Sequence, residues 1–195
     1  PPPPIHHTLS LHDALPICIT EIGESRAQEL KEKYAVAGDR ARWHFIGHLQ
    51  TNKVRNVVGI ARLIHSVDRY GLAEAIARRA RGLGLVQEVL IEINIARDPN
   101  RHGVDPAQAA SLAQKVATLD GVRVRGVMGM APFLDDPADT RPFFQELAHL
   151  GEAVAAAVPG ATELSMGMTR DYVIAVEEGA TIVRVGEAVF GPRHR

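Results

Sequence analysis

Two glycine-containing turns in the last third of the chain carry the residues best suited to bind an anion. Ser165-Met166-Gly167-Met168-Thr169 follows an apolar run and precedes a helix-like stretch. Backbone N–H groups at such a turn point outward at the positive end of a helix dipole, which favours a phosphate, and the hydroxyls of Ser165 and Thr169 add donors. The second turn is Arg184-Val185-Gly186-Glu187, where Gly186 lets a ligand approach the backbone closely. Each turn alone reads equally well as a plain connection, but the pair favours a phosphate site.

Other candidate chemistries have weaker support. His44 and His48 are separated by Gly47, which breaks the regular spacing of a metal-binding pair, and no cysteine or carboxylate cluster lies nearby in the sequence. We therefore expect no metal site. Ser165 has no adjacent His-Asp pattern, which argues against hydrolase chemistry. Glu92 and Glu163 could supply the base of a phosphate-sugar isomerase, but both are equally well explained as residues of a strand surface or a barrel core.

The elements that must position these residues alternate between short apolar runs and longer amphipathic stretches. Strands rich in Val and Ile are predicted at 19–24, 43–48, 62–67, 88–95, 122–130, 162–166 and 181–185. Helices are predicted at 69–83, 107–119, 139–158 and 171–178, where apolar residues recur three and four apart. Asp105-Pro106 is typical of a helix start, with an N-cap followed by proline at the first helical position.

A repeated order of strand, helix and strand predicts parallel strands joined by crossover helices. This order fits either a closed barrel or an open doubly wound sheet. No Gly-x-Gly-x-x-Gly follows an early strand, which weakens the dinucleotide-binding version of the open sheet. Polar and glycine residues follow many strand ends, as in a TIM-type (β/α) barrel, whose strand ends meet at one mouth and whose last two loops frequently bind phosphate. We predict an α/β barrel with seven strands, one short of closure.

Composition places few other demands on the chain. Its 195 residues suit one domain, and 22 basic residues nearly balance 23 acidic ones, so we expect neither a nucleic-acid nor a membrane partner. A single cysteine, Cys18, fits a reducing compartment, and no apolar run is long enough to span a bilayer, so we expect a cytoplasmic protein. We also expect a monomer. Residues 1–18 show neither helix nor strand periodicity; we expect a non-native or disordered segment there and a barrel domain at 19–195.

Five sequence blocks resemble one known family. The first block is Trp43-His44-Phe45-Ile46-Gly47-His48-Leu49-Gln50-Thr51-Asn52-Lys53, which looks like the family's W-H-F-I-G-x-L-Q-x-N-K segment. Four more blocks match in order, at 64–68 (Ile-His-Ser-Val-Asp), 126–132, 164–171 and 183–191. These blocks are similar to the YggS/PROSC proteins, the pyridoxal phosphate homeostasis family, over about 22–193. The resemblance implies the barrel of alanine racemase and a binding site for pyridoxal 5'-phosphate (PLP).

The resemblance also implies roles for the matched residues. Ser165, Gly167, Met168 and Thr169 would hold the phosphate together with the backbone N–H groups of Gly186 and Glu187. Arg184 would face the pyridine nitrogen, where a permanent positive charge keeps that nitrogen unprotonated and makes the ring a poor acceptor of carbanion electrons. The alternative for Arg184 is an ion pair with Glu187 or Asp171.

Two departures from the family pattern affect this expectation. Gly23-Glu24-Ser25-Arg26 replaces the family's Gly-Glu-Asn-Arg, so that Ser25 stands where an amide is expected beside the cofactor. The family's first strand ends in Ser-Lys, whose lysine binds PLP covalently, and no lysine precedes Lys31 in this chain. We therefore expect noncovalent PLP binding.

The functional prediction is a PLP-binding homeostasis protein without turnover of its own, with PLP-dependent apo-enzymes as recipients of the cofactor. The alternative is a PLP-dependent amino-acid racemase. That family shares the barrel and adds a C-terminal β domain, which supplies a catalytic tyrosine, whereas the sequence here ends at Arg195 shortly after the last predicted strand.

Overall fold

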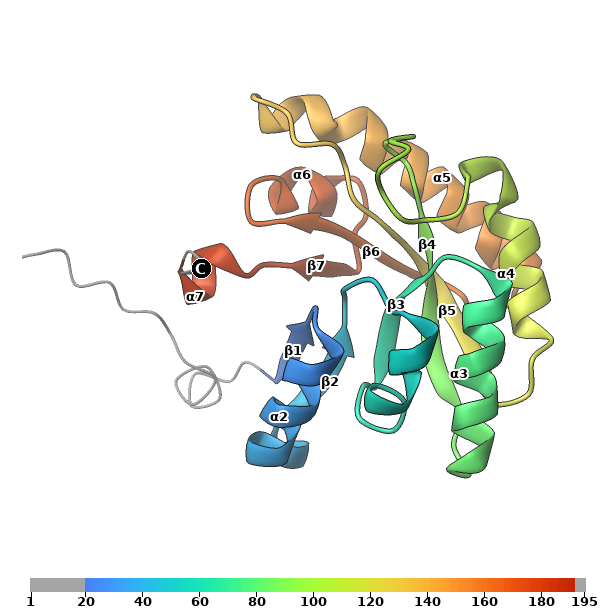
Figure 1. Ribbon diagram of the computed structural model, residues 1–195. Coiled ribbons are helices and arrows are strands. Elements are labelled where there is room, and N and C mark those ends of the chain that lie inside the picture. Colours follow the sequence, from blue (N-terminus) through green and yellow to red (C-terminus); the bar gives the residue numbers. More distant parts are fainter. Residues whose placement is uncertain (1–19, 192–195) are drawn as a thin grey trace, which may run out of the picture.

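The computed structural model describes residues 20–191, and these form a single curved sheet covered by helices on its outer face (Figure 1). All seven strands are parallel and follow one another in sequence order around the sheet. The strands are β1 (Glu21–Glu24), β2 (Arg42–Phe45), β3 (Leu63–Val67), β4 (Gln87–Ile93), β5 (Val122–Gly129), β6 (Glu163–Met168) and β7 (Ile182–Arg184). Every strand lies where an apolar run predicted one.

The connections between the strands carry the helices. The α-helices are α2 (Ala27–Ala37), α3 (Tyr70–Gly82), α4 (Ala109–Ala117), α5 (Arg141–Ala157), α6 (Tyr172–Glu177) and α7 (Glu187–Phe190). Short 3-10 helices are η2 (Gly38–Arg40), η3 (Thr51–Asn56), η4 (Pro106–Gln108) and η5 (Pro137–Thr140). The predicted start at Asp105 is confirmed, since its side chain accepts a hydrogen bond from the N–H of Ala107 and Pro106 begins η4.

Alternation along the strands creates two apolar regions. In β2 the side chains of Trp43 and Phe45 are buried under the helices, while Arg42 and His44 point to the other face of the sheet. The large core therefore lies between the outer face and the helices. A second, small cluster of Leu63, Leu90 and Met128 fills the inside of the curved sheet, where polar side chains accompany it.

The sheet curls into a nearly closed barrel, which confirms the predicted fold class. Within residues 20–191, β1 and β7 are the two unpaired edges, and Figure 1 shows them on the two sides of the opening. The expectation for residues 1–18 falls outside the described residues. Among those that are described, no helix has the length and apolar character needed to cross a membrane.

Candidate cofactor-binding site

Arg184, the last residue of β7, points into the barrel. Its Nη1 donates a hydrogen bond to Ser165 Oγ at 2.6 Å, and its Nη2 donates one to the carbonyl oxygen of Gly129 at 3.1 Å. The alternative of an ion pair with Glu187 or Asp171 does not occur among the described residues. Burial lowers the pKa of Arg184 to about 10, so the guanidinium stays charged at neutral pH. A guanidinium has five N–H donors, and these two contacts leave others to face a ligand.

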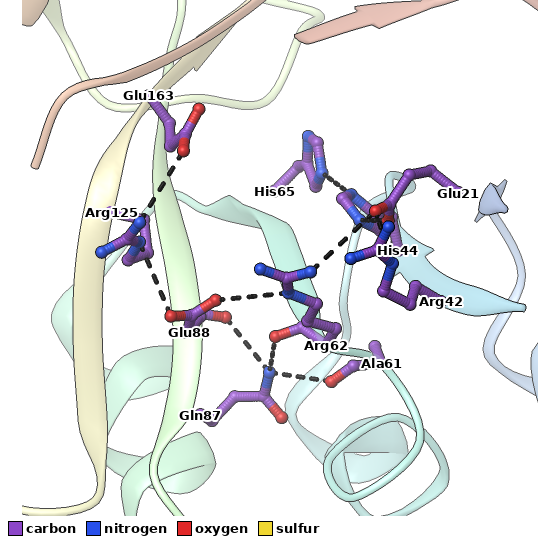
Figure 2. A network of polar contacts seen from close by, with 10 residues as sticks. All are labelled: Glu21, Arg42, His44, Ala61, Arg62, His65, Gln87, Glu88, Arg125 and Glu163. Atoms are coloured by element: carbon purple, nitrogen blue, oxygen red, sulfur yellow. Dashed lines mark hydrogen bonds and ion pairs between the residues drawn. The ribbon is translucent and has the colours of Figure 1, made fainter. Parts of the chain in front are cut away.

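Ser165 begins a chain of hydrogen bonds that crosses the inside of the barrel. Its Oγ lies 2.9 Å from His65 Nδ1, His65 Nε2 lies 2.9 Å from His44 Nδ1, and His44 Nε2 lies 2.8 Å from Glu21 Oε2. Figure 2 shows the outer half of this chain, in which His65, His44 and Glu21 point toward one another. The chain therefore connects Arg184 at one end of the barrel with a half-exposed carboxylate at the other.

Burial lowers the pKa of both histidines, so both rings are neutral at pH 7. For His65 the pKa falls well below its usual value, mainly because the ring is buried and also because a protonated His44 and the charged Arg184 would each repel a positive charge on it. For His44, burial is the main cause and outweighs the opposing effect of Glu21. A neutral imidazole has one donor and one acceptor. Because Glu21 can only accept, the donors are then fixed in one direction, from Ser165 to His65, from His65 to His44 and from His44 to Glu21.

Glu92 adds a second buried polar group at the mouth. The side chain extends from the end of β4 and only 4% of the residue is exposed. Its Oε2 has no hydrogen-bond partner, and the same holds for the hydroxyl of buried Ser66. Burial, with the negative charge of Asp68, raises the pKa of Glu92 to about 7, although Arg184 opposes the shift. A cationic group with free donors and a carboxyl with an orphan oxygen fit a ligand that carries both acceptors and a donor, as PLP does.

The predicted phosphate turns lie side by side, because Met168 of β6 pairs with Arg184 of β7. Gly167 needs its glycine identity, since it has φ +86° and a Cβ there would lie 2.5 Å from the Cβ of Ala175. Gly186 faces open space and precedes α7, whose first N–H groups, beginning with Glu187, have no partner inside the helix.

Other parts of the predicted phosphate site are arranged differently from the expectation. Ser165 and Gly167 belong to β6 rather than to a turn after it, and Ser165 is fully buried. The backbone N–H of Met168 donates a hydrogen bond to Asp171 Oδ1 at 2.6 Å, so a phosphate at this turn would compete with that carboxylate. Thr169 is half-buried beside it.

Ser25 stands at the end of β1, across the opening from β7. Its backbone N–H donates to Glu24 Oε1 at 2.6 Å. The segment after β2 approaches closely at Gly47, where a Cβ would lie 2.0 Å from the carbonyl oxygen of Ser25. The structure therefore places Ser25 on the rim of the barrel, directly after β1 rather than among the residues of β6 and β7.

None of the four lysines extends from a strand. Lys31 and Lys33 belong to α2, Lys53 to η3 and Lys115 to α4. Lys33 forms an ion pair with the buried carboxylate of Glu24. No lysine of this chain thus occupies a strand position inside the barrel.

The opposite end of the barrel is closed by alternating charges. Arg62 pairs with Glu21 at 3.9 Å and with Glu88 at 3.8 Å, and Arg125 pairs with Glu88 at 3.6 Å and with Glu163 at 3.8 Å (Figure 2). Glu163 therefore belongs to these ion pairs at the end of the barrel where the strands begin. It lies at the start of β6 and not at the mouth, where the chemistry of barrel enzymes occurs. This placement removes one of the two bases considered for an isomerase.

Comparison with known proteins identifies the family. The family model described as the alanine racemase N-terminal domain matches residues 7–194. A pyridoxal phosphate homeostasis protein of Aquifex aeolicus is 44% identical over 176 residues, covering 88% of this chain and 76% of that protein. The corresponding protein of Deinococcus radiodurans is 40% identical over 170 residues, covering 87% and 76%. The chain belongs to the pyridoxal phosphate homeostasis family.

Solved structures agree with this family assignment. PipY of Synechococcus elongatus, solved with PLP bound, is 35% identical with a TM-score of 0.84, over 92% of this chain and 85% of that one. Alanine racemase of Clostridium difficile is 13% identical with a TM-score of 0.74, over 94% of this chain and 48% of that one, which shows the shared fold alone. The resemblance seen in the sequence blocks is thereby confirmed.

Sequence reasoning named Arg184 and the glycine turns as candidates, but it did not name the side chains that contact them inside the barrel. His65 and His44 lie inside two of the matched blocks but have no spacing that marks them as partners of Ser165, which is 100 residues away from His65 in the chain. A usable signal was present in the inward alternation of β2 and β3, where both histidines fall on the barrel side.

Proposed function

We propose that this chain binds PLP at the carboxyl ends of β6 and β7 and takes part in intracellular PLP homeostasis without turnover of its own. The observation that carries the proposal is Arg184, held inside the barrel by Ser165 and Gly129 with donors left free. Family membership and the PLP-bound structure of PipY support the same ligand.

In the proposed site the phosphate lies between the β6 turn and α7. Gly167 and Thr169 would line it on one side, and the N–H groups of Gly186 and Glu187 on the other. Met168 would contribute its N–H after the contact with Asp171 opens. Ser165 would support the site indirectly, by accepting a hydrogen bond from Arg184. Ser25 would line the site from the end of β1.

In the proposed site the charge of Arg184 affects the chemistry that bound PLP could support. PLP supplies an electron-withdrawing ring and a reactive aldehyde when it is bound. A guanidinium beside the ring nitrogen keeps that nitrogen unprotonated, which weakens the ring as an acceptor of carbanion electrons. Arg184 therefore disfavours reactions that depend strongly on this acceptor, and the preference for carriage over racemisation is supported by the family relatives.

The binding is proposed to be noncovalent, because the four lysines lie on helices rather than on barrel strands. Charge-assisted hydrogen bonds contribute about 1.5–3 kcal/mol each, so several of them retain a ligand in roughly the micromolar range. We further propose a cytoplasmic monomer that delivers PLP to apo-enzymes.

The test is a titration with PLP followed by visible absorption, then reduction with borohydride and intact mass measurement. We expect saturable binding and no mass increase. Arg184→Ala should weaken binding at least about tenfold, since it removes a charge-assisted contact, whereas Arg79→Ala, an exposed change on α3, should bind as the unaltered chain does. A reducible adduct on Lys33 or Lys53 would contradict noncovalent binding, and turnover of alanine enantiomers would support the racemase alternative.

A further inference from the structure

Three metal-ligating side chains meet at the mouth of the barrel, beside the proposed cofactor site. His48 follows β2, Asp68 follows β3, and His102 lies in the loop that returns to β4 through the bridge between Val104 and Ile93. One ligand atom from each residue lies within 4.8 Å of the other two. The residues come from three separate connections, so their convergence is a property of the fold rather than of local sequence.

The spacing within the cluster suits a shared ion better than direct contact. His48 Nδ1 lies 3.9 Å from Asp68 Oδ2, which is too long for a hydrogen bond. Zinc binds nitrogen and oxygen ligands at about 2.0–2.2 Å in a tetrahedral arrangement, which places neighbouring ligand atoms roughly 3.3–3.6 Å apart. The gap between the carboxylate and the imidazole is thus close to the one an ion would need.

The carboxylate is already oriented for such a role. Arg69 Nη1 donates to Asp68 Oδ1 at 2.6 Å, which leaves Oδ2 facing His48. Arg69 is itself held by a longer contact to Thr51 Oγ1 at 3.4 Å. Carboxylates that bind metals are commonly fixed in this way by a second hydrogen-bonded group.

The two imidazoles are stacked, with ring centroids 3.5 Å apart and an angle of 11° between their planes. Both histidine residues are exposed, so one ring can turn about its Cβ–Cγ bond until the two lone pairs converge.

We propose that His48, Asp68 and His102 bind a divalent transition-metal ion, with zinc as the best fit. Two imidazoles and one carboxylate are a donor set that zinc accepts, whereas magnesium and calcium prefer oxygen ligands throughout. Three protein ligands leave a fourth position to water, as in zinc sites that carry out chemistry. His44 is not part of the site, because its two ring nitrogens contact His65 and Glu21.

The test uses the full chain after removal of metals with a chelator. Zinc is titrated by calorimetry and cobalt(II) by visible absorption, which reports tetrahedral coordination. We expect one site, and we expect His48→Ala, Asp68→Asn and His102→Ala each to weaken zinc binding more than about 100-fold, since even outer-sphere partners are worth about 10- to 100-fold. His149→Ala is the matched control, because His149 is exposed and lies 3.4 Å from Glu152.

A second variant tests whether histidines elsewhere in the chain account for the zinc binding. His6, His7 and His12 lie outside the described residues and offer nitrogen ligands of their own. The triple variant with alanine at these positions should retain the site. Loss of zinc binding in that variant, or unchanged binding in Asp68→Asn and His102→Ala with normal circular dichroism, would overturn the proposal, as would the absence of binding below about 1 mM zinc.

Discussion

At the residue scale, the hydroxyl of Ser165 makes its hydrogen bonds with side chains inside the barrel. With both histidines neutral, the Ser165 proton goes to His65, and Arg184 occupies one lone pair of the same oxygen. Ser165 can therefore position Arg184 but has no proton left for a phosphate. Ser66, the residue after His65 in β3, is also buried, and its hydroxyl has no hydrogen-bond partner. The two serines form a matched pair for testing this argument.

We expect Ser165→Ala to lower the free energy of unfolding by about 1–3 kcal/mol, because it leaves buried donor and acceptor groups of Arg184 and His65 unpaired. Ser66→Ala should be neutral or stabilising, since it removes a hydroxyl that is buried without a partner. Urea unfolding at neutral pH measures both. Equal losses in the two variants would show that the hydrogen-bond chain does not support the barrel.

Glu92 should make stability fall as the pH rises. Its folded pKa of about 7 lies above the ordinary value of 4.5, so the folded state binds the extra proton and is favoured below about pH 4.5, and this advantage is lost as the pH rises through 7. The full shift corresponds to roughly 3 kcal/mol as an upper limit. Asp68 and Arg184 are the charges that act on it.

The measurement is urea unfolding of the unaltered chain and of Glu92→Gln at about pH 5 and about pH 8. Glutamine keeps the shape and cannot titrate, so the variant should gain stability relative to the unaltered chain at the higher pH. His65 acts in the opposite direction, because its lowered pKa costs stability as the pH falls below 6.5. A variant with the same alkaline loss as the unaltered chain would place the titrating group elsewhere.

At the element scale, the strands could be predicted because nearly all of them bury apolar residues; β7, which has no fully buried residue, is the exception. β3, for example, is buried at all of its positions, and its Val and Ile residues mark it in the sequence. The helices α3, α4 and α5 were equally visible from their spacing. The short elements η3, with six residues, and α7, with four, were not predicted, because such short segments do not show a helical apolar repeat.

The candidate site could be predicted only where its residues follow one another in the chain. Gly186 and Arg184 share a turn, so their proximity is local. His65 and Ser165, and likewise His48, Asp68 and His102, come together through strand order and register, which the sequence pattern does not encode residue by residue. Neutral side chains inside a barrel also lack the charge patterning that marks a surface.

A glycine in β5 sets the register at which this strand meets β6. Gly126 has φ +152°, lies at the irregular pairing between β4 and β5, and approaches Glu163 so closely that a Cβ would stand 1.9 Å from its carbonyl oxygen. We expect Gly126→Ala to destabilise the fold by at least about 3 kcal/mol, through backbone strain and displacement of β6.

The control for Gly126→Ala is Gly82→Ala at the end of α3. A Cβ at Gly82 meets nothing within 4 Å, so alanine there should be neutral or stabilising by up to about 1 kcal/mol. Thermal unfolding followed by circular dichroism compares the two variants. A Gly126→Ala protein as stable as the unaltered chain would mean that β5 and β6 can separate without cost to the barrel.

At the scale of the whole molecule, ion pairs close the end of the barrel where the strands begin, and the barrel wall is open between β1 and β7. The alternating pairs from Glu21 through Glu88 to Glu163 span the strands from β1 to β6. On the β7 side, exposed apolar residues gather on α6 and β7, with Val173 and Val176 each 54% exposed. Unpaired strand edges beside apolar surface are positions where an added strand gains both hydrogen bonds and burial.

The last prediction joins this opening to the proposed chemistry. The family resemblance places a Ser-Lys pair at the end of a first strand, which would lie between β7 and β1. We expect that fusing the N-terminal strand of the Aquifex aeolicus relative in front of Ile19 raises the midpoint of thermal unfolding, because both edges become paired. It should also create a borohydride-reducible lysine adduct with PLP and tighten binding. The same fusion with alanine in place of that lysine separates the effects, since it should keep the thermal gain and lose the adduct. If the fusion that retains the lysine unfolds at the same temperature as the unaltered chain and forms no adduct, then the opening between β1 and β7 does not accept the strand.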